Sequence, residues 1–248
     1  MLIESNQNPK FKKWSKLKQK KNRNQMQEYL IEGEHLVLEA IKTQSIKEIL
    51  VREGSEHLQK KEILEGNQYY VINSKLFNTL AGTETPQPIM AVCEMKKTPI
   101  INEKRLLLLD KVQDPGNLGT LIRSAVAFGF DGIVLGDGCV DLYNEKVVRS
   151  TQGAIFKIAI EQKSLLECIK ELHQNNVLVF GTSLENGEPL QTIQRSEKMA
   201  FILGNEGQGV SKELIAEMKQ NIFIEIDENI ESLNVSIAGS IIMYQFRQ

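Results

Sequence analysis

The 248-residue sequence has no uninterrupted apolar run near the ~18 residues that a membrane-spanning helix needs. Its first residues, Met1 to Asn6, lack the apolar segment of a secretory signal, so we expect no secretion. It has only three cysteines and three histidines, and both sets are widely spaced. This spacing argues against a disulfide framework, a zinc knuckle or another metal site. We expect a cytoplasmic protein that requires no metal.

Proline is also scarce, and its positions suggest how the chain is divided. Only six prolines occur, and three of them, Pro86, Pro88 and Pro99, fall close together. Proline cannot continue a helix and suits an edge strand or a linker. A chain of this length can bury one large core or two modest ones. We place a boundary near residues 97–104 and predict two domains, residues 1–100 and 101–248.

Positive charge is concentrated near the N-terminus. Between Ser5 and Gln27 there are eight basic residues and no acidic one, so this segment carries +8 and the rest −10 within a net charge of −2. Such an arm attracts a polyanion by releasing counterions. Phe11 and Trp14 within it are placed to stack on nucleic-acid bases. Alternatively, they and Leu17, at i, i+3 and i+6, dock a helix whose charged face is solvated.

The first block of sequence has the pattern of a small α/β unit. Apolar residues repeat at helical spacing in some segments and form short strand-like runs in others. The pattern predicts helices at 32–41 and 74–80, and strands at 46–51, 69–72 and 89–93.

The second block alternates short apolar runs with longer amphipathic segments. This alternation predicts a parallel sheet with helices on both faces. Residues 105–112 are apolar enough for a strand that is buried on both sides. The predicted strands are 105–112, 133–135, 177–180, 200–203 and 222–226. The predicted helices are 117–128, 143–151, 164–175, 211–220 and 233–246.

Three short segments of this block place a polar side chain beside glycine or another small residue. They are DPGNLGTLIR at 114–123, LGNEG at 203–207 and SLNVS at 232–236. Glycine lets a backbone approach a ligand closely, and ligands bind at the carboxyl ends of strands in open α/β sheets. Each polar residue also has a structural explanation, since Asn117 and Ser232 can cap helices and Glu206 can be a turn carboxylate.

Two other glycine patterns partly match nucleotide-binding motifs. Gly204 and Gly209 have the spacing of a P-loop, but Val210 follows where the phosphate-binding lysine should stand, which disfavours NTP hydrolysis. The segment at 136–138, Gly-Asp-Gly, begins like a dinucleotide fingerprint. Its third glycine is replaced by Asp141, whose charge would repel a pyrophosphate.

In their order along the chain, the three polar segments resemble the SpoU-type branch of the SPOUT RNA methyltransferases. The resemblance implies transfer of a methyl group from S-adenosylmethionine to a ribose 2′-hydroxyl of RNA. It also implies a C-terminal trefoil knot and a homodimer formed through the catalytic domain. By residue-wise match, the catalytic residues are Asn117, Arg123, Glu206 and Asn234. The cofactor is held near Thr182, Gly204, Ile224, Ile226 and Leu233.

The same resemblance extends to the first domain and to the substrate. Residues 29–34 (YLIEGE) are similar to the opening of the small α/β substrate-binding domain of these enzymes. We therefore expect residues 1–100 to bind RNA, and ribosomal RNA rather than transfer RNA as the substrate. Two alternatives stay open: a methyltransferase that modifies transfer RNA or a base, and a non-catalytic RNA-binding protein on the same fold.

The role of Arg123 raises a chemical difficulty. A guanidinium has a pKa above ~12 and is a poor base at neutral pH. Our hypothesis is that Arg123 binds the RNA phosphate and stabilises the developing alkoxide. A buried arginine at this place would need an anion, whereas an exposed one would need no special explanation.

Overall fold

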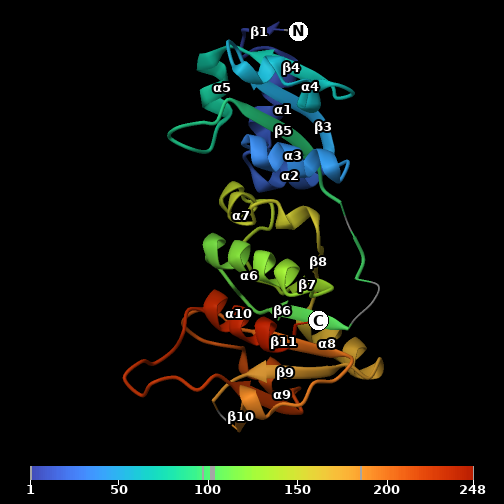
Figure 1. Ribbon diagram of the computed structural model, residues 1–248, viewed down its shortest axis with the longest axis vertical. Helices are drawn as coiled ribbons and strands as arrows, with labels where there is room; N and C mark the ends of the chain where they lie inside the picture. The colour runs from blue at the N-terminus through green and yellow to red at the C-terminus, as the bar shows by residue number, and fades with distance from the viewer. Residues whose placement is uncertain (1, 97, 101–103, 185, 248) are drawn as a thin grey trace. The chain divides into compact units, whose positions relative to one another are not determined.

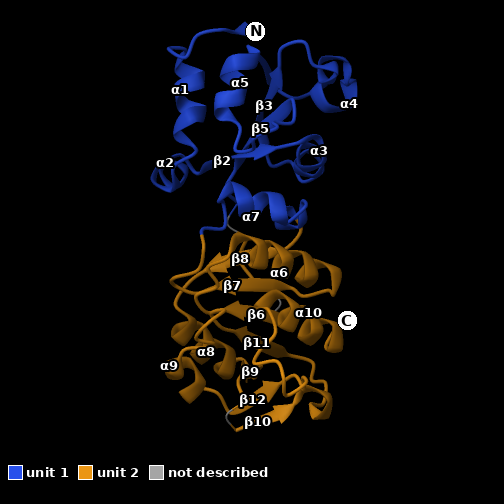
Figure 2. Cartoon of the chain, turned by 90° about the vertical axis from the view of Figure 1, so that its left-hand side faces the viewer, with its two compact units in different colours: residues 1–96, 141–156 blue, residues 97–140, 157–248 orange. Residues whose placement is uncertain are grey.

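The computed structural model describes residues 2–96, 98–100, 104–184 and 186–247. The chain divides into two compact units, Met1–Lys96 with Asp141–Phe156, and Lys97–Val140 with Lys157–Gln248 (Figure 2). The boundary predicted near residues 97–104 lies partly outside the described residues. Residues 141–156, which the sequence interpretation assigned to the second domain, pack within the first unit.

The first unit contains a five-stranded mixed sheet in the order β1-β4-β3-β5-β2 (Figure 1). Its parallel pairs are β1 with β4 and β3 with β4, whereas β5 is antiparallel to β2 and β3. Its strands are β1 (Leu2–Ile3), β2 (Glu28–Glu32), β3 (Ile46–Arg52), β4 (Tyr69–Ile72) and β5 (Ile89–Glu94). Its α-helices are α1 (Pro9–Lys16), α2 (Lys20–Met26), α3 (Glu34–Lys42), α4 (Lys61–Leu64), α5 (Ser74–Leu80) and α7 (Glu145–Ser150).

Helix α7 belongs to the first unit because its segment makes specific contacts there. The rings of Tyr143 and Tyr29 lie 4.5 Å apart. The Arg23 guanidinium pairs with the Asp141 carboxylate. The start of α7 is fixed locally by Asn144, whose side chain accepts a hydrogen bond from the backbone N–H of Lys146. The Tyr143–Tyr29 and Arg23–Asp141 contacts could not be inferred from the chain order, because they join residues more than 100 positions apart.

The basic N-terminal arm is folded onto the first unit. Phe11, Trp14 and Leu17 are all buried, which confirms the docking alternative. The expectation that Phe11 and Trp14 stack on bases is therefore wrong, because neither ring can reach a ligand. Part of the arm's charge is also compensated within the protein, since Lys10 pairs with Glu48 and Lys13 with Glu28.

The second unit contains a seven-stranded sheet in the order β10-β12-β9-β11-β6-β7-β8, and all its strand pairs are parallel. Figure 2 shows α6 and α10 on one face and α8 and α9 on the other, as predicted. The strands are β6 (Arg105–Leu109), β7 (Gly132–Leu135), β8 (Ala159–Gln162), β9 (Leu178–Thr182), β10 (Gly187–Pro189), β11 (Met199–Leu203) and β12 (Gln220–Phe223). The helices are α6 (Pro115–Ala127), α8 (Leu165–Gln174), α9 (Lys212–Ala216) and α10 (Val235–Gln245).

The central strands of this sheet are apolar because helices cover both of their faces. Leu106 and Leu108 of β6 pack with Ile202 of β11 and with the apolar side of α8. Within the described residues, no helix is long and apolar enough to span a bilayer. Since β6, β9, β11 and β12 run in one direction, their carboxyl ends meet at one edge of the sheet. The three polar segments follow or face these ends.

Candidate functional site

Two helices begin at the carboxyl edge of the sheet, and side chains fix where each begins. Asp114 caps α6, because its side chain accepts a hydrogen bond from the backbone N–H of Asn117. Asn234 caps α10 by accepting from the backbone N–H groups of Ser236 and Ile237. The capping roles considered for Asn117 and Ser232 are therefore wrong. Capping by Asp114 leaves the Asn117 amide available for other contacts.

The polar residues from the three segments form one hydrogen-bonded chain. The Asn234 Nδ2 donates to Asn117 Oδ1 at 2.9 Å, and the Asn117 Nδ2 donates to Glu206 Oε1 at 3.0 Å. These residues are separated by 117 and 89 positions in the sequence. The fold thus brings together three of the four predicted catalytic residues, in an order that fixes the orientation of each amide.

Glu206 is the acceptor at the end of this chain. Burial raises the pKa of its carboxyl, but hydrogen bonds from Asn117 and from the backbone, including the N–H groups of Asp114 and Gln113, outweigh burial and hold the pKa below its usual value. The group is therefore a carboxylate at neutral pH, and a weak base. It anchors Asn117 through charge-assisted hydrogen bonding.

Asn205 also shapes this loop, although the sequence interpretation assigned it no role. Its Nδ2 donates to the carbonyl oxygen of Lys111 at 3.0 Å, and its Oδ1 accepts from the backbone N–H groups of Gly207 and Gln208. Its place between Gly204 and Glu206 was the available signal. Asn205 holds the loop after β11 in a closed turn, which presents Glu206 to Asn117.

Arg123 stands apart from the other predicted catalytic residues. It lies on an exposed position of α6, and it makes no hydrogen bond or ion pair with the part of the chain that the structure describes. It does not line the cavity beside the site. The buried environment considered for it is not present, and the guanidinium is accessible to a ligand that approaches from solvent.

A cavity of about 590 Å3 lies next to the polar chain. The predicted cofactor residues all line it, as does Glu206, whereas Asn117 and Asn234 do not. Its apolar side chains suit the faces of a planar aromatic ring such as adenine. Acidic residues at the same cavity suit a cationic sulfonium and ammonium. These acidic residues are Glu206, Glu225, Asp227, Glu228 and Glu231.

Close backbone contacts build one wall of this cavity. A Cβ atom on Gly204 would lie 2.0 Å from the carbonyl carbon of Gly209 and 2.1 Å from the backbone nitrogen of Val210. Only glycine fits there, so the chain after β11 can fold tightly back on itself. The side chain of Thr182 donates a hydrogen bond to the carbonyl oxygen of Ile202, which ties the end of β9 to β11. The residues present therefore fit S-adenosylmethionine.

Among residues 2–96, 98–100, 104–184 and 186–247, no three His, Cys, Asp or Glu side chains lie close enough together to hold a metal ion.

The second unit combines a parallel sheet with an asparagine–glutamate chain beside a cavity. Comparison with known proteins shows to which family a chain with these features belongs. The model of the SpoU rRNA Methylase family matches residues 104–244, and that of the MRM3-like substrate binding domain matches residues 8–91. The chain belongs to the SpoU rRNA methylase family, which confirms the resemblance found in the sequence.

Individual relatives are similar to this chain over nearly its whole length. The 23S rRNA (guanosine(2553)-2′-O)-methyltransferase RlmP of Bacillus subtilis (strain 168) is 45% identical over 246 residues, 99% of this chain and 98% of that protein. An AdoMet-bound rRNA methyltransferase from Sinorhizobium meliloti has a TM-score of 0.88 at 30% identity, covering 99% of this chain and 96% of that chain. The SpoU methyltransferase AviRb from Streptomyces viridochromogenes shares the fold, with a TM-score of 0.84 at 23% identity over 96% of this chain and 97% of that chain.

Proposed function

We propose that this chain methylates a ribose 2′-hydroxyl of ribosomal RNA with S-adenosylmethionine as the methyl donor. The observation that carries the proposal is the hydrogen-bonded chain Asn234–Asn117–Glu206 beside a cavity that fits the donor. Family membership and the full-length similarity to a 23S rRNA 2′-O-methyltransferase support it.

The donor site is assigned to the cavity lined by Thr182, Gly204, Ile224, Ile226 and Leu233. S-adenosylmethionine, when bound, supplies an electrophilic methyl group on a sulfonium. The protein has to hold the ribose hydroxyl in place and stabilise the negative charge that develops on its oxygen. Positioning of this kind contributes up to about 7–11 kcal/mol to the lowering of a barrier.

The roles of the polar residues follow from their contacts. Glu206 orients Asn117 and takes no proton, because its lowered pKa makes it a weak base. Asn117 and Asn234 present their amides to the substrate. Arg123, which is exposed on α6, binds an RNA phosphate and stabilises the developing alkoxide, while the hydroxyl proton passes to solvent water.

The first unit is proposed to bind the RNA. Its match to a substrate-binding domain covers residues 8–91, and we take residues 1–100 as this domain and 101–248 as the catalytic one. The lysines of the N-terminal arm that make no ion pair with the described residues supply the positive charge that a polyanion needs. They are Lys12, Lys16, Lys18, Lys20 and Lys21.

Three further assignments belong to the same proposal. The chain forms a homodimer through its catalytic domain, which would cover the exposed apolar residues Ile237, Ile241 and Tyr244 of α10. Helix α10, which packs on α6, reaches its place through the trefoil knot implied by the resemblance. The enzyme works in the cytoplasm, where its rRNA substrate is made.

The function is tested by mapping modified nucleotides in total RNA from cells with and without the gene. The proposal expects one ribose 2′-O-methyl mark to disappear from ribosomal RNA and to return when the gene is restored. Loss of a mark from transfer RNA alone, or loss of a base methyl group, would contradict it.

A further inference from the structure

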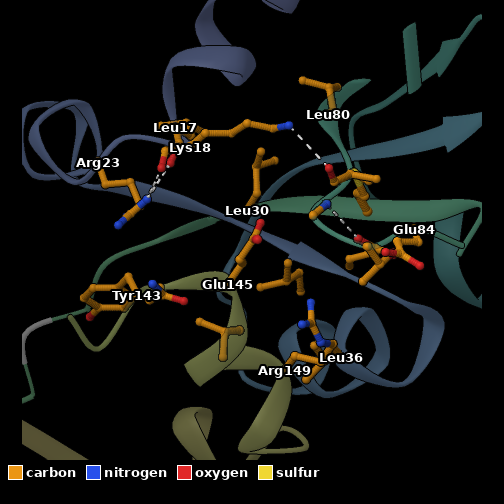
Figure 3. Close-up of a pocket in the computed structure, with 18 residues that line it drawn as sticks. Leu17, Lys18, Arg23, Leu30, Leu36, Leu80, Glu84, Tyr143, Glu145 and Arg149 are labelled. Carbon is orange, nitrogen blue, oxygen red and sulfur yellow. Dashed lines mark hydrogen bonds between the residues drawn. The ribbon is translucent and has the colours of Figure 1, made fainter. Parts of the chain in front are cut away.

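A second cavity, of about 510 Å3, lies within the first unit and shares no residue with the candidate site (Figure 3). Strand β2, the turn between α1 and α2, the loop at 80–84 and α7 surround it. Its volume is in the range of small-molecule pockets, about 300–1,000 Å3. Its apolar lining consists of Leu17, Leu30, Ile31, Leu36, Leu80, Ala81, Met90 and Val148.

Three charged side chains at this cavity, Glu84, Glu145 and Arg149, make no hydrogen bond or ion pair with the described residues. Glu145 and Arg149 are one turn apart on α7, a spacing at which opposite charges ordinarily pair. Neither side chain makes a hydrogen bond or an ion pair with any described residue. Both line the cavity, and Figure 3 shows them on the same side of it. The cavity wall therefore offers a carboxylate acceptor and a guanidinium donor that do not neutralise each other.

The place of the Glu145 carboxylate is determined by the neighbouring loop. A Cβ atom on Gly82 would lie 1.9 Å from Glu145 Oε2, so the carboxylate fills the space where any other residue would have a side chain. The loop itself is held by Glu32, which accepts hydrogen bonds from the Gly82 backbone N–H, from Thr83 Oγ1 and from the Gln87 backbone N–H. Glu145 is thus positioned by the fold and remains unpaired.

The opposite wall carries two basic residues, Lys18 and Arg23, and lies close in sequence to exposed lysines. The Lys18 ammonium donates to the carbonyl oxygens of Thr79 and Ala81, and Figure 3 shows its side chain reaching toward Ala81. The Arg23 guanidinium is held by the Asp141 carboxylate. The exposed residues Lys16 and Lys20 are close in sequence to Lys18, and neither pairs with a described carboxylate. A ligand with phosphates outside the cavity and an aromatic group inside it would complement this arrangement.

We propose that this cavity binds one unpaired guanine base of the substrate RNA. Guanine presents two adjacent donors, N1–H and the N2 amine, to a single carboxylate, here Glu145. Arginine is the usual partner of its O6 and N7 acceptors, here Arg149. Unpaired bases are recognised in this way on their edges, with their faces against apolar or aromatic side chains such as Tyr143. The inference rests on the proposed function in that RNA is the ligand.

The test measures binding of short fluorescent RNAs to the full-length protein by anisotropy. The RNAs are oligouridines with one central guanosine, inosine or adenosine. The guanosine RNA should bind about tenfold more tightly than the adenosine RNA, a typical value for reading one base. Inosine, which lacks the N2 amine, should bind less tightly than guanosine.

Two variants and a control connect this preference to Glu145. Glu145→Gln should remove the difference between guanosine and inosine. Gly82→Ala keeps the carboxylate but displaces it, and should weaken the preference as well; Gly82 does not have a positive φ, so alanine is compatible with its backbone. Glu65→Gln, at an exposed position that does not line the cavity, should bind all three RNAs like the unmodified protein.

Equal binding of guanosine and adenosine RNAs by the unmodified protein, or a guanosine preference that survives Glu145→Gln, overturns the inference. Binding of free guanosine monophosphate as tight as that of the RNA would assign the cavity to a mononucleotide and overturns it too. Methyl transfer to rRNA is measured in parallel. Transfer without guanosine preference contradicts this inference alone, whereas guanosine preference without transfer supports it and contradicts the proposed function.

Discussion

At the scale of single residues, the site consists of amides oriented by one carboxylate. Glu206 fixes Asn117, and Asn117 meets Asn234, so a change at one residue should disturb the others. The sequence was sufficient to select these residues because the three segments that contain them resemble, in their order along the chain, the motifs of the SpoU-type enzymes. It was insufficient to assign their contacts, because Asp114 and Asn117 both could cap α6 and only the fold shows that Asp114 does.

Replacing Arg123 with alanine should abolish methyl transfer and leave the affinity for S-adenosylmethionine nearly unchanged. The guanidinium is exposed and does not line the cavity proposed for the donor, so its loss should remove only the proposed contact to the RNA. Single-turnover transfer and calorimetric titration measure the two effects. Arg123→Lys, which keeps the charge but loses the two-pronged geometry, should retain part of the activity. Full turnover by Arg123→Ala would exclude this residue from the mechanism.

Asn234 caps α10, and substitutions can separate this structural role from its proposed catalytic role. Asn234→Ala should lower the free energy of unfolding by about 1 kcal/mol through loss of the α10 cap, and should lower transfer as well. Asn234→Ser keeps a capping oxygen but has no amide to donate to Asn117, so it should restore stability without restoring transfer. Denaturant titration and transfer assays measure both. Equal activity of the serine variant and the unmodified protein would contradict the role of the amide.

The lowered pKa of Glu206 makes a contribution to stability that depends on pH. Because the folded-state pKa lies below the ordinary value of 4.5, the ionised carboxylate stabilises the folded protein above that pH. The contribution is lost as the pH falls through the folded-state pKa. The difference in unfolding free energy between the unmodified protein and Glu206→Gln should therefore shrink on acidification. Glu65→Gln is the control, and a pH-independent difference for Glu206→Gln would contradict this explanation.

At the scale of secondary-structure elements, the sequence predicted the buried strands and the helices covering them. The predicted ranges 105–112 and 164–175 contain β6 and α8, and 200–203 covers all of β11 but its first residue. They were found because buried elements carry long apolar runs or strong periodicity. The prediction missed β8 and β10, since they are edge strands without a buried apolar run. It also missed β2, because no strand was assigned to residues 28–31 and Glu32 was taken as the start of the following helix.

The turn after β11 should not tolerate a side chain at Gly204. In Gly204→Ala the new methyl group would meet the backbone of Gly209 and Val210, which cannot move aside cheaply. We expect a loss of about 1–3 kcal/mol in unfolding free energy and weaker binding of S-adenosylmethionine. The matched control is Gly207→Ala, where the nearest atom to the new Cβ would be 3.7 Å away. If Gly204→Ala and Gly207→Ala bound S-adenosylmethionine with equal affinity, the proposal that Gly204 forms a wall of the donor site would be contradicted.

At the scale of the whole molecule, the sequence predicted two domains and assigned residues 141–156 to the second, whereas they pack within the first unit. That division depends on long-range contacts, such as Tyr143 with Tyr29, that no local pattern reveals. The N-terminal arm is a second case in which long-range packing could not be predicted. Its charge and its aromatic residues suggested base stacking, whereas the fold buries the rings of Phe11 and Trp14.

The proposed homodimer is a prediction about the whole molecule. Ile237, Ile241 and Tyr244 lie at i, i+4 and i+7 on α10 and are 50%, 38% and 54% exposed, which is unusual for an apolar row. Light scattering should give twice the single-chain mass of 28.1 kDa for the unmodified protein and the single mass for Ile241→Glu. Tyr69→Glu, at an exposed position of β4, should remain dimeric. A dimer that survives Ile241→Glu would exclude this face.

The most direct test of the account is transfer of a labelled methyl group from S-adenosylmethionine to ribosomal RNA by the purified protein, followed by nucleoside analysis. We predict a single labelled 2′-O-methylnucleoside with the unmodified protein, and loss of that label when Asn117→Ala is used. Label on a base, or undiminished labelling by Asn117→Ala, would contradict it.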